Sequence, residues 1–204
     1  MKLVVELKGH WGEVGQLPDG DAGIAATIAG MQAAIDEAVF GEDGWLLRKV
    51  ATSIRRGASA NRNDMPKRLY EWCQDNIRFQ ADPADVELLR LPAQIARAAM
   101  YGKVRRGEKI GADCDDLAMF ACSILAVWGF KPVLITVGRT AQQLGGRFEH
   151  VFYAIRGESG QLTPFDPQEN VPPGAWGNVD LQRIRAWLCN VSAPWAKAAA
   201  GGGA

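Results

Sequence analysis

Cys114 is the residue of this chain with the clearest potential for chemistry. It stands in the stretch GADCDDLAMFAC (111–122), where a thiol lies among three carboxylates just as an apolar, helix-like run begins. His150 follows in FEHVFYAI, and Asp166 ends the segment LTPFD. In this order the three groups can act together. Cys114 would attack a carbonyl carbon, His150 would take and return a proton, and Asp166 would fix the imidazole tautomer and favour the imidazolium.

The carboxylates around Cys114 are expected to cap a helix. Asp113 is a natural N-cap residue, and Asp116, three positions on, can complete a capping box, which places Cys114 in the first helical turn. Backbone amides and the helix dipole stabilise a thiolate there, whereas the adjacent carboxylates oppose it. Cys114 therefore needs a cation or a base from elsewhere in the fold. Asp115 and Asp116 are expected to cap the helix and bind the preceding basic loop.

His150 is the candidate base, because the sequence holds two histidines and His10 lies in a turn-rich segment without an evident partner. On its predicted strand His150 alternates with Phe148 and Phe152. An imidazole buried in such a row without a hydrogen bond would cost on the order of 1–3 kcal/mol. A hairpin through the ESGQ turn would bring Asp166 back toward His150 and supply that hydrogen bond.

Each of these residues also has an ordinary structural explanation. A single cysteine on an apolar helix face is usually a small packing residue, and a single strand histidine is more often a satisfied core residue. Asp166, in FDP, fits a turn before proline. The ordered combination of all three favours catalysis. The other cysteines, at positions 73, 122 and 189, are expected to pack as free thiols.

The elements that position these residues follow from hydrophobic spacing. Apolar residues recur every three or four positions in five stretches, which predicts helices at about 21–39, 44–56, 66–77, 92–101 and 114–128. Segments rich in β-branched and aromatic residues predict strands at KLVVEL, PVLITVG, FEHVFYAI and LTPFD. Turns are expected after the first strand, an exposed basic loop at 103–113, and a short helix in VDLQRIRAWLC. The expected fold class is α+β, with a helical N-terminal half and a central helix packed on a small antiparallel β-sheet.

Composition argues against several classes of protein. Lys plus Arg (23) equals Asp plus Glu (23), so no overall charge draws the chain to nucleic acid or to a membrane surface. No signal peptide or membrane-spanning stretch is evident, which predicts a cytoplasmic protein. Four cysteines without a CxxC pair, and two histidines 140 positions apart, suggest neither a zinc site nor a disulfide framework. No metal and no cofactor is expected.

The succession GADCDDLAMFACSILAVWGFKPVLITVG, FEHVFYAI and LTPFDP resembles the core of the transglutaminase-like superfamily, whose fold is related to papain-type cysteine peptidases. The resemblance covers about 70–170 and includes WCQDNIRFQADP upstream. It implies that Cys114, His150 and Asp166 occupy the catalytic triad positions. The backbone N–H of Cys114 would form half of an oxyanion hole, with Gln94 and Trp72 as candidates for the other half. Phe79, at the matching aromatic turn, has no donor.

The reaction implied by this resemblance is acyl transfer from an amide through a thioester. Hydrolysis is expected first, by a peptidase or amidase acting on a protein or peptide. A crosslinking transglutaminase is one alternative, and a non-catalytic or dual-role assembly protein of a phage particle is another. Phage structural proteins would then be partners, and the location would be a bacterial cytoplasm or a virion. The expected regions are an N-terminal strand and helical part at 1–62, the transglutaminase-like core at 63–192 and a flexible tail at 193–204.

Overall fold

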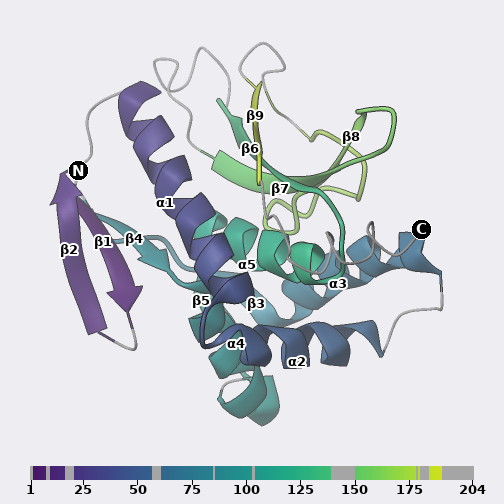
Figure 1. Ribbon diagram of the computed structural model, residues 1–204, viewed down its shortest axis with the longest axis horizontal. Coiled ribbons are helices and arrows are strands. Elements are labelled where there is room, and N and C mark those ends of the chain that lie inside the picture. Colours follow the sequence, from purple (N-terminus) through teal and green to yellow (C-terminus); the bar gives the residue numbers. More distant parts are fainter. Residues whose placement is uncertain are drawn as a thin grey trace, which may run out of the picture.

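The computed structural model describes residues 2–7, 10–16, 21–56, 61–84, 86–102, 104–138, 150–177, 179 and 184–189. The described chain is a mixed α+β fold with five α-helices, most of them N-terminal, and a four-stranded antiparallel sheet in contact with the last helix (Figure 1). This confirms the expected fold class. Residues 139–149, which include the first two residues of the predicted strand FEHVFYAI, and the predicted tail from 193 lie outside the described residues. The helices are α1 Asp21–Phe40, α2 Gly44–Arg55, α3 Met65–Asn76, α4 Pro92–Tyr101 and α5 Cys114–Val127.

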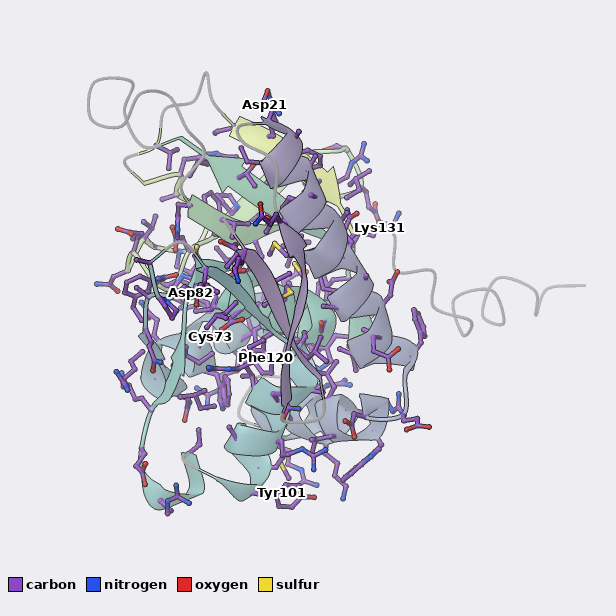
Figure 2. The ribbon with its side chains drawn as sticks, turned by 90° about the vertical axis from the view of Figure 1, so that its left-hand side faces the viewer. Asp21, Cys73, Asp82, Tyr101, Phe120 and Lys131 are labelled. Carbon is purple, nitrogen blue, oxygen red and sulfur yellow. The ribbon has the colours of Figure 1, made fainter. Side chains whose placement is uncertain are left out.

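Helix α5 is the centre of the fold. Every residue from Asp115 to Ala126 is buried, as expected for a helix that is apolar on nearly all sides. In Figure 1, α5 lies between the four-stranded sheet and the layer formed by α2 and α4, and α1 packs across it. Figure 2 shows Phe120, which is fully buried, near the middle of the molecule and Tyr101, which is exposed, at its margin.

The end of α5 follows from Gly129. This residue has a φ of 77°, a left-handed conformation that glycine adopts without steric penalty. Its N–H donates to the carbonyl of Ala126 at 2.9 Å, and the N–H of Phe130 donates to the carbonyl of Leu125 at 3.0 Å. These bonds satisfy carbonyls at the helix end. The chain then turns directly into the sheet that packs on α5.

The four-stranded sheet has the strand order β8-β7-β6-β9, and every neighbouring pair is antiparallel. Its strands are β6 Pro132–Val137, β7 His150–Arg156, β8 Leu162–Phe165 and β9 Ile184–Leu188. Tyr153 and Phe165 join the main core with α5, whereas Phe152 belongs to a second, smaller core on the other side. His150 is the first residue of β7 and pairs with Val137, the last residue of β6. The three strands predicted from the sequence for this sheet are confirmed.

Strand β9 corrects one prediction. The segment VDLQRIRAWLC was expected to form a helix, but Ile184–Leu188 is an edge strand paired with β6. The Trp187 indole N–H donates to the Thr136 hydroxyl at 3.0 Å, which ties the two strands through their side chains. Pairing with an existing sheet therefore decided the conformation of a sequence whose local pattern also suits a helix.

Two smaller sheets account for the remaining strands. β1 Lys2–Leu7 confirms the predicted first strand and lies between β2 His10–Gln16 and β4 Val86–Arg90, antiparallel to the first and parallel to the second. Turns were expected after the first strand, but His10–Gln16 in this region forms β2, and β4 was not predicted. β3 Ile77–Phe79 pairs in parallel with β5 Ile110–Ala112.

The expectation of an exposed basic loop at 103–113 is wrong at its C-terminal end. The segment contains a 3-10 turn, η2 Val104–Arg106, followed by β5, in which all three residues are buried. An earlier 3-10 turn, η1 Arg62–Asp64, precedes α3. Because β5 pairs with β3 and leads into α5 after one residue, the segment before Cys114 is held by the fold.

One hydrophobic core joins early and late elements of the chain. Buried residues of α1 and α2 belong to the same cluster as those of α5, β7 and β8. The division of the chain near residue 62 stays a prediction. No helix in the described ranges is both long enough and apolar enough to cross a membrane.

Candidate active site

Cys114 is held at the beginning of the central helix. The Asp113 carboxylate accepts a hydrogen bond from the N–H of Asp116 at 3.3 Å, which makes Asp113 the N-cap of α5. The preceding Ala112 pairs with Phe79, and its carbonyl accepts from the N–H of Gln80 at 3.0 Å. Cys114 is half-buried although the following twelve residues are buried. Cys114 is therefore placed by the helix start and stays partly exposed.

His150 and Asp166 form a buried pair. His150 Nε2 lies 2.7 Å from Asp166 Oδ2, and the two residues are only 6% and 5% exposed. The β7–β8 hairpin creates this contact, because Tyr153 pairs with Phe165, immediately before Asp166. The other Asp166 oxygen accepts from the N–H of Glu169 at 3.2 Å. The carboxylate is therefore oriented by its own turn as well as by the imidazole.

The His150 imidazole also interacts with the Cys114 thiol, which is one of the groups that raise its pKa. Burial alone would lower the pKa of His150, but the hydrogen bonds to Asp166 and Cys114 and the charges of these groups outweigh burial and raise it to about 9. Because Nε2 is engaged by Asp166, Nδ1 is the ring nitrogen left for the thiol proton. The structure thus brings together the three residues that the sequence singled out, in the order thiol, imidazole, carboxylate.

The oxyanion candidates are placed less closely. The N–H of Cys114 belongs to the first helical turn, whose N–H groups have no intrahelical acceptor. Gln94 lies on the first turn of α4, where its backbone N–H donates to the Leu91 carbonyl at 2.8 Å. The ring of Trp72 lies 5.4 Å from the ring of Phe120. Phe120 itself is about 9 Å from Cys114 along the axis of α5. The second oxyanion donor stays a prediction.

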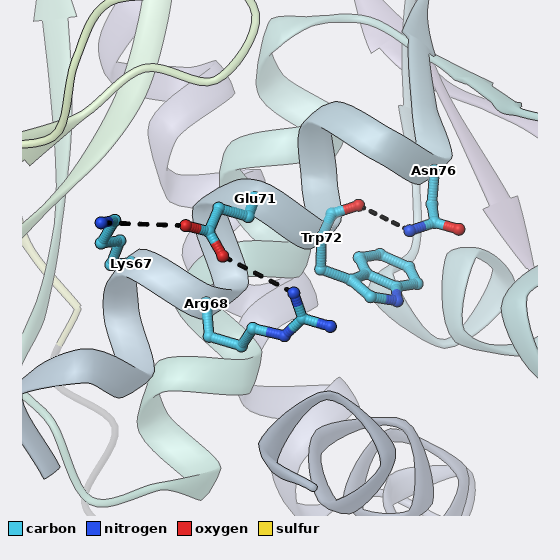
Figure 3. A network of polar contacts seen from close by, with 5 residues as sticks. All are labelled: Lys67, Arg68, Glu71, Trp72 and Asn76. Atoms are coloured by element: carbon cyan, nitrogen blue, oxygen red, sulfur yellow. Dashed lines mark hydrogen bonds and ion pairs between the residues drawn. The ribbon is translucent and has the colours of Figure 1, made fainter. Parts of the chain in front are cut away.

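Trp72 belongs to a helix whose outer face carries exposed charges. Figure 3 shows Lys67 and Arg68 both approaching Glu71, at 4.0 and 3.5 Å, while the Asn76 amide donates to the Trp72 carbonyl at 2.8 Å. Ion pairs this exposed contribute little to stability. The same helix presents Leu69 and Cys73 to the core on its opposite face, so α3 is amphipathic and needs no further explanation of its charges.

A cluster of carboxylates surrounds the start of α5, and the sequence predicted only part of it. Asp116 accepts from the backbone N–H of Arg90 at 2.7 Å, so it ties α5 to β4. One oxygen of Asp115 accepts from the N–H of Asp116 at 2.9 Å, and the other is buried with no hydrogen-bond partner among the described residues. Asp82 and Glu87 come close enough to interact with Asp113. The described neighbours of Asp115 and Asp116 come mainly from the β4 region, and their expected binding to the basic loop stays a prediction.

Burial dominates the electrostatics of this cluster. It is the main cause that raises the pKa of Asp115 and Asp116 well above the ordinary value, and the charge of Asp113 adds to it. Burial first, and then the charge of Asp113, raise the pKa of Asp82 to about 6 and that of Glu87 to about 7. The cluster therefore holds its protons to higher pH than isolated carboxyl groups do.

The cluster is also the place where a cation could bind. The carboxylate oxygens of Asp113, Asp115 and Asp116 all lie within 4.8 Å of one another. Oxygen donors at this spacing suit a hard divalent cation such as Ca²⁺ or Mg²⁺. Shared protons and a bound cation would relieve the same repulsion. The sequence-based expectation of no metal and no cofactor stays a prediction.

Comparisons with known proteins give one structural likeness. A solved structure described as "a Putative Cysteine Protease from Cytophaga hutchinsonii" aligns with a TM-score of 0.40 and 12% sequence identity, over 70% of this chain. The alignment spans 42% of that protein's chain, which is less than half of its length. No protein-family model matches, and no curated protein matches.

The raised pKa values of Asp82 and Glu87 predict how stability depends on pH. Because the folded state holds these protons more tightly than the unfolded state, the free energy of unfolding should fall as pH rises from about 4 to about 7. Glu87→Gln should remove part of this dependence, leaving stability at pH 4 nearly unchanged and raising it at pH 8 by on the order of 2 kcal/mol. Urea unfolding at several pH values measures the effect.

Asp75→Asn is the matched control for this experiment, because Asp75 is exposed on α3 and is not part of the cluster. It should leave the slope of stability against pH unchanged. Equal slopes for the wild type and Glu87→Gln would show that Glu87 titrates at the same pH in the folded and unfolded states, contrary to the prediction.

Proposed function

We propose that this protein is a cysteine-dependent amide hydrolase that works through a thioester intermediate. The observation that carries the proposal is the buried His150–Asp166 pair, joined at 2.7 Å, whose imidazole also interacts with Cys114 at the start of α5. A packing cysteine needs no such neighbour. A nucleophile needs a base, and the base needs an orienting group, so the His150–Asp166 pair supports the proposal.

The reaction follows from the roles that these groups can take. The Cys114 proton passes to His150 Nδ1, and the sulfur attacks the carbonyl carbon of an amide. As negative charge develops on the carbonyl oxygen, the backbone N–H groups at the start of α5 can stabilise it. When the C–N bond breaks, the imidazolium returns its proton to the leaving amine and a thioester remains. Water, deprotonated by His150, then attacks the thioester, which releases a carboxylic acid and restores the thiol.

The finer assignment is to the transglutaminase-like superfamily, and it rests on the motifs around the three residues. We infer hydrolysis in preference to transamidation because hydrolysis requires no second acceptor site. The substrate class is a protein or peptide. Incubation with casein and a fluorescent amine separates the two reactions, since hydrolysis releases new amino termini and transamidation attaches the amine to casein. Amine incorporation without cleavage would overturn the hydrolytic assignment.

Selective alkylation tests whether Cys114 is activated. Iodoacetamide at about pH 6, where His150 is an imidazolium, should label Cys114 at least about ten times faster than Cys189, the other half-buried cysteine. Cys73 and Cys122 are buried and should react slowest. Peptide mass analysis after limited labelling measures all four sites in one experiment.

His150→Ala should remove the preference for Cys114, because the imidazolium that stabilises the thiolate is lost. His10→Ala is the matched control and should leave the preference intact. Equal labelling of Cys114 and Cys189 in the wild-type protein would contradict the proposed function. So would a preference that survives His150→Ala.

A further inference from the structure

A cavity of about 380 Å³ adjoins the Cys114 region and the turn that carries Asp166. Ala112 and Leu117, which line it, stand two residues before and three residues after Cys114. Pro167, which also lines it, directly follows Asp166. An acyl group attached to Cys114 would therefore have this cavity beside it. The volume is at the small end of ligand sites and suits one or two side chains rather than a large molecule.

Among the residues that the structure describes, the lining of the cavity carries no charged side chain. Its apolar part includes Ile77, Phe79 and Leu117, and its polar part consists of the amides of Gln74, Gln168 and Asn170, besides the Cys73 thiol. Transfer of a charged group into such surroundings without a partner is strongly unfavourable. A neutral side chain loses far less hydration and gains contact with the apolar walls.

The wall of the cavity is held in place by a hydrogen-bond network. The Gln74 amide nitrogen donates to the Tyr70 hydroxyl at 2.9 Å and to the Asn170 side-chain oxygen at 2.6 Å. Lys109 donates to the backbone carbonyl of Gln74 at 2.9 Å. The bond to Asn170 connects α3 to the turn after β8, and the bond from Lys109 connects α3 to the segment before β5, so the wall of the cavity is tied together at three points. A preformed site loses less conformational entropy when it binds a ligand.

Phe79 supplies an unburied apolar surface at this cavity. It is the most exposed of the large hydrophobic residues in the described part of the chain, at 59%. Arg78, which precedes it in β3, is also exposed, and the residue that pairs with Phe79 in β5 is the small Ala112. An aliphatic or aromatic side chain in the cavity would cover the ring and remove apolar surface from water.

We propose that this cavity binds the substrate side chain on the acyl side of the scissile amide and selects an uncharged side chain, aliphatic or aromatic, over a charged one. The proposal rests on the proposed function, because it places the scissile carbonyl at Cys114. Gln168 is the residue through which the charge preference can be changed, since it lines the cavity and is replaceable by a charged side chain of similar length.

The test uses five fluorogenic substrates, acetyl-Ala-Xaa-aminomethylcoumarin with Leu, Phe, Gln, Lys or Glu at Xaa. Leu and Phe should give kcat/KM values at least about ten times those of Lys and Glu, with Gln between them. Phe79→Ala should lower the values for Leu and Phe by about five- to twenty-fold and leave iodoacetamide labelling of Cys114 unchanged. Gln168→Glu should raise the value for Lys relative to Leu by about ten-fold, and Gln168→Lys should do the same for Glu.

Gln161→Glu is the matched control for the charge swap, because Gln161 is exposed in the β7–β8 turn and does not line the cavity. It should leave the substrate profile unchanged. Cleavage of the panel with no preference, or a profile that Gln168→Glu does not move, would overturn the cavity assignment while the proposed function stands. No cleavage of any substrate together with unselective labelling of Cys114 would overturn both.

Discussion

Cys114→Ser should lower kcat/KM for any amide that the protein hydrolyses by at least about 10⁴-fold. The serine hydroxyl occupies nearly the same space, so the helix start and its cap should be preserved. A hydroxyl is much less acidic than a thiol. Because the imidazole is positioned for a sulfur atom, it does not activate the serine oxygen effectively. The measurement is the rate of aminomethylcoumarin release from the best substrate of the panel, with circular dichroism as the check on folding.

Cys189→Ser controls for the loss of a half-buried thiol elsewhere in the fold. It should keep kcat/KM within about threefold of the wild type. Cys189 directly follows β9 and packs against the main core, apart from the candidate catalytic residues. Activity of Cys114→Ser within tenfold of the wild type would show that another residue carries the acyl group, and the thioester mechanism would be wrong.

The helices of this fold could be predicted because their patterns are long and periodic. In α1, Ile28, Met31, Ile35 and Val39 are spaced by three and four and are all buried. In α5 the apolar run is nearly continuous and lies between an Asp cap and Gly129. Both signals are local, so the sequence contains all that is needed to recognise them.

The missed and wrong elements depend on contacts between distant segments. β4 has no clear alternation, and it becomes a strand through parallel pairing with β1, which lies more than 80 residues earlier. β9 contains Ile184, Trp187 and Leu188 at helix-like spacing, but the edge of β6 was available for pairing. In both cases tertiary pairing outweighs local propensity, and a single sequence does not reveal the partner.

The candidate site divides in the same way. His150 and Asp166 belong to one hairpin, so their proximity follows from a short turn and could be predicted. Asp82 and Glu87 approach the start of α5 only because β4 is placed beside it, and no pattern within ADPADVELLR indicated this. Cys114 therefore has more acidic surroundings than the sequence indicated. A positively charged His150 is correspondingly more important for a thiolate at this position.

Asp166→Asn should lower kcat/KM by about 10²- to 10⁴-fold and also change the titration of His150. Asparagine keeps the shape of the side chain but removes the charge, and it can present a donor to the ring in place of an acceptor, which favours the wrong tautomer. Burial, which lowers the pKa of His150, would then be opposed only by the Cys114 interactions. The pKa of His150 should therefore fall below the wild-type value of about 9. The chain has two histidines, so in an NMR titration of the imidazole ring protons only His10 has to be distinguished from His150.

The same substitution should alter stability in a defined pH window. The raised pKa of His150 stabilises the folded wild type fully below about pH 6.5, and this contribution, on the order of 3 kcal/mol, is lost as pH rises to about 9. Asp166→Asn should flatten the stability profile in that window and leave the carboxylate-dependent slope between pH 4 and 7 in place. Glu158→Gln, an exposed substitution in the same hairpin, should change neither the rate nor the profile. A purely structural Asp166 would lower stability by a similar amount at every pH and leave the His150 titration where it was, so the two measurements together separate an orienting carboxylate from a packing one.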